Sequence, residues 1–152
     1  MTMKLSDFLK DIFKADKTVG VSKFRIYLLR FIYVVTFIFL GIMDAWKQIF
    51  SHQDKWDTFQ GVAYSFWAAY STLMLLGLRY PLKMIPLLLL QFFYKLIWLI
   101  VIALPLFSSH QLKGSFAEGT ANVFFYACIL DLIIIPWSYV FKSYLLKQYN
   151  RR

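Results

Sequence analysis

The chain has 152 residues, 60% of them hydrophobic and 20% aromatic, and its formal net charge is +9. Its length fits one domain, and an apolar share so far above that of soluble domains excludes an ordinary water-soluble globular protein. The single cysteine, Cys128, excludes both an intrachain disulfide and a redox centre built from a cysteine pair. The excess of basic residues is typical of segments that flank membrane spans, so we expect no binding to nucleic acid.

The first predicted element is an amphipathic helix over residues 2–17. Its apolar residues recur at helical spacing and form one stripe, with charged residues on the other faces; the stripe consists of Leu5, Phe8, Leu9, Ile12 and Phe13. This pattern predicts a helix that lies on a membrane surface. The alternative is a docking helix for a cytoplasmic partner.

Four longer apolar segments follow, at about 26–43, 60–78, 84–107 and 120–141, and each is long enough to cross a bilayer. Asp44 is expected to close the first span, and residues 44–59 are expected to form a loop or short helix at the membrane interface. Residues 78–83 leave room only for a tight hairpin, in which Pro81 ends one helix and suits the first turn of the next. The predicted fold is therefore an all-α, polytopic membrane protein of four transmembrane helices with a surface helix.

The second predicted span carries small residues at four-residue spacing. Gly61, Ser65 and Ala69 form this series, and Gly77 lies two steps further along the same face. Such a face lets helices approach closely. We expect it to pack within the molecule, with dimerisation as the alternative.

The basic residues predict the topology. Thirteen Lys and Arg residues lie in the N-terminal segment, the 78–83 hairpin and the C-terminal tail, whereas three lie in the other two loops. By the positive-inside rule, both termini are expected in the cytoplasm.

Two ionisable residues lie near the middle of predicted spans: Lys95 in the third and Asp131 in the fourth. Gln91 precedes Lys95 by one turn and Trp98 follows it by nearly one turn, so all three form a stripe that could face Asp131. Pro136 removes the N–H that would bond the carbonyl of Leu132, which protein or water must then satisfy. A charge at the centre of a bilayer needs a partner, so we expect Lys95 and Asp131 to meet.

The two residues have two main interpretations, and a third alternative is that they lie on different subunits or do not meet. In the first, they form a structural ion pair that holds two helices together, with Gln91 filling the remaining hydrogen-bond capacity. In the second, they line a watery path and exchange protons or contact a substrate.

Metal and cofactor sites are not expected. The residues that could suggest a metal do not match a ligand motif; they are His52, Asp54, Asp57, His110 and Glu118. Neither histidine lies within a span, which argues against a haem. No nucleophile, zinc or thiol motif occurs, so we expect no catalytic residue and a non-enzymatic protein.

The run from Gly77 to Leu99, GLRYPLKMIPLLLLQFFYKLIWL, resembles the centre of a group of small, uncharacterised, four-helix bacterial integral membrane proteins. Asp131 together with Ile135-Pro136-Trp137 resembles their last span. The resemblance covers about half of the chain and includes Lys95. It implies a location in the bacterial inner membrane and carries no activity.

From these observations we expect an accessory, scaffold or assembly subunit of the inner membrane, in contact with the lipid bilayer and with a membrane protein partner or a second copy of itself. The alternative is a small oligomeric transporter or channel that uses Lys95 and Asp131 for protons, ions or a substrate. An enzyme acting on lipid is the third possibility, with His52, Asp54 and His110 as its candidates.

Overall fold

The computed structural model describes residues 20–51 and 57–146, and in them the chain is helical without a β-strand. The predicted surface helix at residues 2–17 lies outside this range. Four described segments are long and apolar enough to cross a membrane, and they are Lys23–Ser51, Thr58–Arg79, Ile85–Ser108 and Ala117–Ile134. The all-α prediction with four such helices is confirmed. The described residues form two compact units: 20–51, 57–85 and 138–146 make up the first, and 86–137 make up the second.

The first unit begins with one continuous helix made of α2 (Lys23–Thr36), η1 (Phe37–Trp46) and α3 (Lys47–Ser51). Ser22 caps its start, because its Oγ accepts a hydrogen bond from the Arg25 amide at 3.3 Å. The helix passes through Asp44, where the sequence predicted the end of a span. A single carboxylate marks the edge of an apolar stretch, but it leaves the backbone hydrogen bonds intact, so the helix does not stop there.

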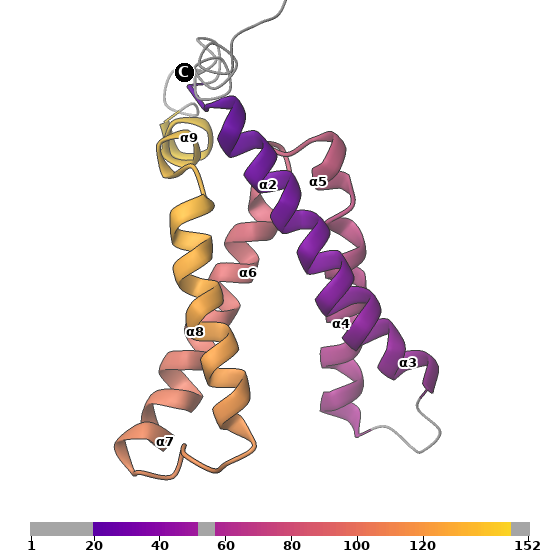
Figure 1. Ribbon diagram of the computed structural model, residues 1–152, viewed down its shortest axis with the longest axis vertical. Helices are drawn as coiled ribbons and strands as arrows, with labels where there is room; N and C mark the ends of the chain where they lie inside the picture. The colour runs from indigo at the N-terminus through magenta and orange to yellow at the C-terminus, as the bar shows by residue number, and fades with distance from the viewer. Residues whose placement is uncertain (1–19, 52–56, 147–152) are drawn as a thin grey trace, which may run out of the picture. The chain divides into compact units, whose positions relative to one another are not determined.

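Helix α4 (Thr58–Leu73) begins at Asp57, whose Oδ2 accepts hydrogen bonds from the amides of Phe59 and Gln60, both at 3.1 Å. Beyond the segment that joins them, α4 runs back along η1 (Figure 1). The two helices approach closely where their buried residues are small: Gly41 and Ala45 on η1, Ala68 and Ser71 on α4.

The small-residue face predicted for the segment Thr58–Arg79 takes part in packing only near the end of that segment. Ser65 and Ala69 are exposed. Gly77, in contrast, is buried, and a Cβ at this position would overlap the ring of Tyr33. The contact face is set by Ala68 and Ser71, which the four-residue series does not contain. Dimerisation through the exposed part of the series stays a prediction.

The first unit continues with α5 (Leu76–Arg79), and a turn over residues 80–84 leads into the next helix. Tyr33, fully buried on α2, donates a hydrogen bond from its hydroxyl to the carbonyl of Pro81 in this turn at 2.8 Å. Close to the C-terminus, η3 (Phe141–Leu146) also reaches the turn, because the hydroxyl of Tyr144 donates to the carbonyl of Leu82 at 3.4 Å. Pro81 lies in the turn rather than in the first turn of the following helix.

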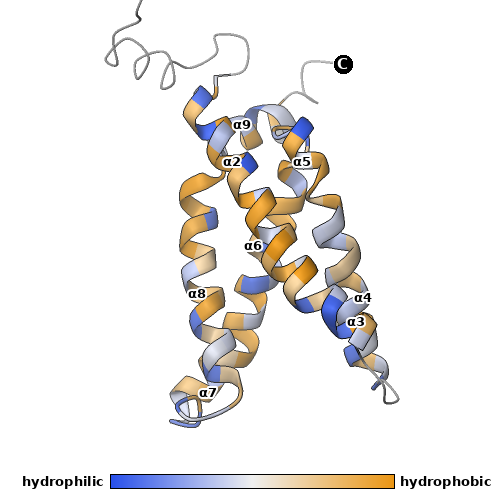
Figure 2. Ribbon diagram, turned by 45° about the vertical axis from the view of Figure 1, so that its right-hand side comes forward, coloured by the Kyte–Doolittle hydropathy of each residue, from blue (hydrophilic) through white to orange (hydrophobic). Residues whose placement is uncertain are grey.

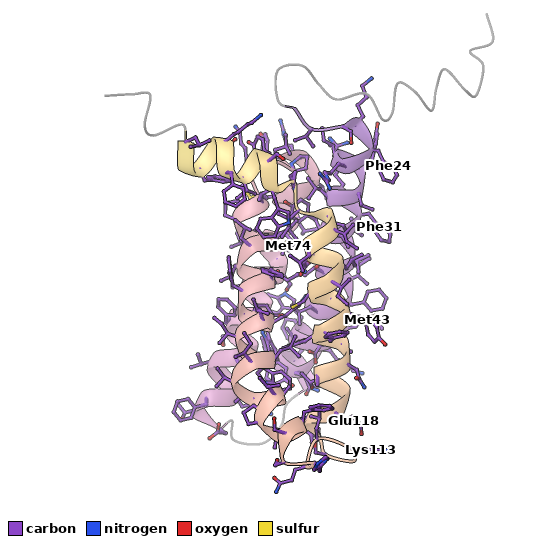
Figure 3. The ribbon with its side chains drawn as sticks, turned by 90° about the vertical axis from the view of Figure 1, so that its left-hand side faces the viewer. Phe24, Phe31, Met43, Met74, Lys113 and Glu118 are labelled. Carbon is purple, nitrogen blue, oxygen red and sulfur yellow. The ribbon has the colours of Figure 1, made fainter. Side chains whose placement is uncertain are left out.

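The second unit is a hairpin. Its first arm is continuous through α6 (Ile85–Trp98), η2 (Leu99–Ala103) and α7 (Leu104–Ser108), and its second arm is α8 (Ala117–Ile134). Figure 1 shows α6 and α8 running side by side in opposite directions. In the loop, Gly114 has a φ of 79° and its amide donates to the Glu118 carboxylate at 2.7 Å (Figure 3).

Helix α8 ends earlier than the predicted fourth span, which ran to residue 141. Ile135 is extended, with φ −60° and ψ 123°, because the residue before a proline is pushed away from helical geometry. The chain then turns at Pro136 into the short α9 (Trp137–Val140) and η3. The apolar sequence is continuous here, but the helix is not.

Much of the apolar surface of the helices is exposed. Figure 2 shows hydrophobic colour along most of the length of α2 and α8, interrupted by single hydrophilic segments. Phe24, Phe31 and Met43 mark such an outward face on the first helix, with exposed fractions of 43%, 61% and 58% (Figure 3). A helix that keeps large apolar side chains on its outside suits a lipid environment.

Candidate functional site

The three polar residues predicted to meet do so inside the second unit. Gln91 and Lys95 lie one turn apart on α6, and Asp131 lies on α8. All three are buried, with exposed fractions of 4%, 8% and 2%. The antiparallel hairpin brings them level: Lys95 lies midway along the continuous first arm, and Asp131 lies in the last turn of α8.

Gln91 binds the carboxylate of Asp131 with one nitrogen. Its Nε2 lies 2.9 Å from Oδ1 and 3.0 Å from Oδ2, so both carboxylate oxygens accept from the same amide. The Nζ of Lys95 lies 3.6 Å from Oδ2. This distance is an ion pair, but it is longer than the 2.7–3.2 Å of an ordinary N–H···O hydrogen bond.

Aromatic and sulfur groups surround the polar residues. The ammonium of Lys95 lies 6.0 Å from the ring centroid of Tyr94, at the outer limit of a cation–π contact. The rings of Tyr94 and Trp98 both pack edge-on against Phe124 of α8. Trp98 thus faces α8 as the predicted stripe requires, but it meets Phe124 two turns before Asp131.

Cys128 extends the site along α8 by one turn. Its thiol is buried and lies 3.9 Å from the carbonyl of Phe92, within reach of a weak S–H···O hydrogen bond. Nothing in the sequence pattern singled out this contact, because a lone cysteine within an apolar run carries no partner signal. Because Cys128 is the one thiol in the chain, its reaction with a maleimide can report on this part of α8.

The carbonyl freed by Pro136 has a partner, as the sequence required. The indole Nε1 of Trp137 donates to the Leu132 carbonyl at 2.9 Å, and its ring packs edge-on against Phe92 of α6. The indole of Trp137 therefore replaces the backbone N–H donor that Pro136 lacks. The adjacent Pro-Trp pair in the sequence is the signal that could have identified this donor.

The other residues considered for a site take separate roles wherever the structure describes them. His52 and Asp54 lie outside the described residues, and Asp57 caps α4. His110 is exposed in the α7–α8 loop with a φ of 57°, and Glu118 binds the amide of Gly114. In the described part of the chain, no group of three or more His, Cys, Asp or Glu side chains could hold a metal ion.

Chemically, the arrangement of Gln91, Lys95 and Asp131 is a nearly closed polar cluster. The carboxylate of Asp131 is engaged on both oxygens and is shielded from solvent. Removing one member of such a cluster leaves a buried polar group without its partner, which typically costs about 3–5 kcal/mol when the survivor is charged. The cluster is thus suited to holding α6 and α8 together.

Comparison with known proteins adds no relative: no family model, curated protein or solved structure matches the chain.

Proposed function

We propose that this protein is a multi-pass membrane protein of the bacterial inner membrane whose four apolar helices cross the bilayer with both termini in the cytoplasm. Helix length supports the proposal, because the four segments have 29, 22, 24 and 18 residues and a bilayer core needs about 20. The outward apolar faces and the excess of basic residues in the termini and the 78–83 hairpin support it as well.

The insertion and topology can be tested together. The protein should stay in the membrane fraction through carbonate extraction. In a Cys128→Ser background, a cysteine at Ser109 should react with a membrane-impermeant maleimide from outside intact cells. A cysteine at Leu82 should react only after permeabilisation. Release by carbonate refutes insertion, and the reverse labelling pattern refutes the topology.

Within the membrane we propose a non-enzymatic role as an accessory, scaffold or assembly subunit, in which Lys95, Asp131 and Gln91 are structural. The observation that carries this role is the enclosure of Asp131 by its partners. One buried amide binds both of its oxygens, an ammonium lies beside it, and only 2% of the residue is exposed. A group that takes up or releases a proton or substrate needs access to water, and the burial of Asp131 therefore supports a structural role.

The test uses a neutral variant that keeps the Gln91 contact. Lys95→Met with Asp131→Asn removes both charges, while the new amide can still accept from Gln91. A scaffold should keep cell growth and its co-purifying partners in this double variant. Loss of the cellular function by a double variant that is folded and inserted would refute the structural role.

The second candidate is the oligomeric transporter or channel, and one distance favours it. At 3.6 Å the Lys95–Asp131 pair is looser than a hydrogen bond, and a loose ammonium can change partners. In proteoliposomes loaded with a pH-sensitive dye, this candidate requires a proton flux that Lys95→Met abolishes. The scaffold proposal expects no flux from the native protein.

A further inference from the structure

Three basic residues lie at one end of the first unit, and we call Arg30, Arg79 and Lys83 the basic cluster. The hydroxyl of Tyr33 on α2 bonds the carbonyl of Pro81 at 2.8 Å, and this fixes α2 against the turn that separates Arg79 from Lys83. Arg30 lies one helical turn before Tyr33, and side chains on a helix lean toward its N-terminus. Figure 1 shows α5 beside α2 at this end, opposite α3.

Two cations of the cluster share one aromatic ring. The guanidinium of Arg79 lies 5.5 Å from the ring centroid of Tyr80, and the ammonium of Lys83 lies 5.2 Å from the same centroid. The two charges are therefore within about 11 Å of each other, whereas the Debye length at physiological salt is about 8 Å. An anion bound beside the Tyr80 ring would meet both charges at close range.

The described part of the first unit supplies no such anion. Its acidic residues are Asp44 and Asp57. Asp44 lies about 21 Å beyond Arg30 along the same continuous helix. Asp57 caps the start of α4, and Arg79 lies at the far end of that 22-residue helical segment, about 33 Å away.

Arg30 gives a second, independent indication of an acceptor. Its Nε is buried and has no hydrogen-bond partner among the described residues. Its guanidinium carbon lies 5.7 Å from the centroid of the Tyr27 ring. A buried N–H without an acceptor costs free energy, and carboxylate and phosphate oxygens are the acceptors that guanidinium groups bind most strongly.

The surroundings of the cluster place it at the level of lipid headgroups. Tyr27 and Tyr80 carry the cations on exposed rings, with exposed fractions of 59% and 42%, as tyrosines do at a membrane interface. Next to the cluster, Phe31 and Leu78 present apolar side chains to the outside, with exposed fractions of 61% and 38%. A ligand bound here meets cations at one end and an apolar surface at the other.

We propose that the basic cluster binds the headgroup phosphate of an anionic phospholipid, whose acyl chains lie along the exposed apolar face. This inference rests on the proposed membrane insertion, because only then does a lipid reach the cluster with this orientation. The adjoining Phe31 and Leu78 favour a lipid over free phosphate, which would leave them in water. Clusters of basic residues beside membrane helices recognise anionic headgroups in this manner.

The test measures lipid retention on the full-length protein by native mass spectrometry after detergent extraction. The protein is offered phosphatidylglycerol or phosphatidylcholine, whose headgroups differ in charge. Arg79→Gln and Lys83→Gln change exposed side chains and should leave folding intact, as thermal melting will verify. Lys47→Gln is the matched control, because Lys47 is an exposed cation about 25 Å beyond Arg30 on the same helix.

We expect the native protein to retain phosphatidylglycerol in preference to phosphatidylcholine. Each of the two cluster variants should weaken that retention about fivefold, since one basic residue near an anionic surface contributes on that order. Lys47→Gln should not change it. Arg30→Lys, which keeps the charge but lacks the Nε donor, should also weaken retention.

Equal retention of the two lipids, or an equal loss in Lys47→Gln, would overturn the proposal. Inorganic phosphate is a separate arm: if millimolar phosphate displaces the lipid completely, the site is one for free phosphate and the lipid assignment is wrong. The carbonate extraction reports on insertion independently. An inserted protein without lipid preference refutes only this inference, whereas a protein released by carbonate refutes the proposed function.

Discussion

Replacing Gly77 by alanine should destabilise the first unit. Gly77 is buried at the crossing of α5 and α2, and a Cβ placed there overlaps the ring of Tyr33. That ring cannot move freely, because Tyr33 is fully buried and its hydroxyl bonds the Pro81 carbonyl. One added methyl therefore displaces both a packed ring and a hydrogen bond.

The magnitude follows from three contributions. Overpacking of a close-packed site costs about 1–3 kcal/mol. Loss of the Tyr33–Pro81 hydrogen bond adds about 1 kcal/mol. The alanine gains up to about 1 kcal/mol relative to glycine in a helix. The net expected loss in the free energy of unfolding of Gly77→Ala is about 1–3 kcal/mol.

The assay is unfolding of the purified protein in mixed detergent micelles with increasing SDS, followed by circular dichroism. Gly119→Ala is the matched control, since Gly119 lies in α8 and an added methyl there would have nothing within 4 Å, so this change should be neutral or stabilising. Adding Tyr33→Leu to Gly77→Ala should remove the clash, and the double variant should lose less than the sum of the two single losses. If Gly77→Ala and Gly119→Ala unfold at the same SDS concentration, the close approach of α5 and α2 is wrong.

Two hydrogen bonds give smaller, local predictions. Asp57→Ala removes the cap that binds the amides of Phe59 and Gln60, and it should cost about 0.5–2 kcal/mol in the same SDS titration, with Asp57→Asn losing less; equal losses would refute the cap. Trp137→Phe keeps a ring but removes the indole donor to the Leu132 carbonyl, and it should cost about 1–3 kcal/mol; unchanged stability would show that another donor satisfies this carbonyl.

The polar residues show which features of the candidate site could be predicted from the sequence. Lys95, Gln91 and Asp131 could be expected to meet because a charge in an apolar run must find a partner, and helical spacing places Gln91 on the face of Lys95. The sequence could not show that Gln91 would take both carboxylate oxygens while Lys95 stays at 3.6 Å. These distances depend on how the side chains of α6 extend toward α8, and the helical spacing of residues does not determine that.

The helix ends were harder to predict than the helices. Apolar runs locate a span, but a helix ends where backbone hydrogen bonds fail. For this reason the first helix continues through Asp44 to Ser51, and α8 stops at Ile134 although the apolar run continues. The tight approach of Gly77 to Tyr33 joins distant segments, so no local pattern could have predicted it.

The structural role of the Lys95–Asp131 pair is tested most directly by the alkylation rate of Cys128. This thiol is buried one turn before Asp131 on α8, so N-ethylmaleimide should reach it when α6 and α8 separate. The rate is measured in native membranes for the wild type, Lys95→Met, Asp131→Asn and the double variant, each normalised to its own rate in SDS.

If the pair holds the hairpin, each single change should raise the normalised rate about 100-fold or more, since an uncompensated buried charge costs about 3–5 kcal/mol. The double variant should return to within about tenfold of the wild type, because its polar groups are neutral and Gln91 keeps an acceptor. Single variants that react as slowly as the wild type, or a double variant that reacts as fast as the singles, would contradict a structural pair.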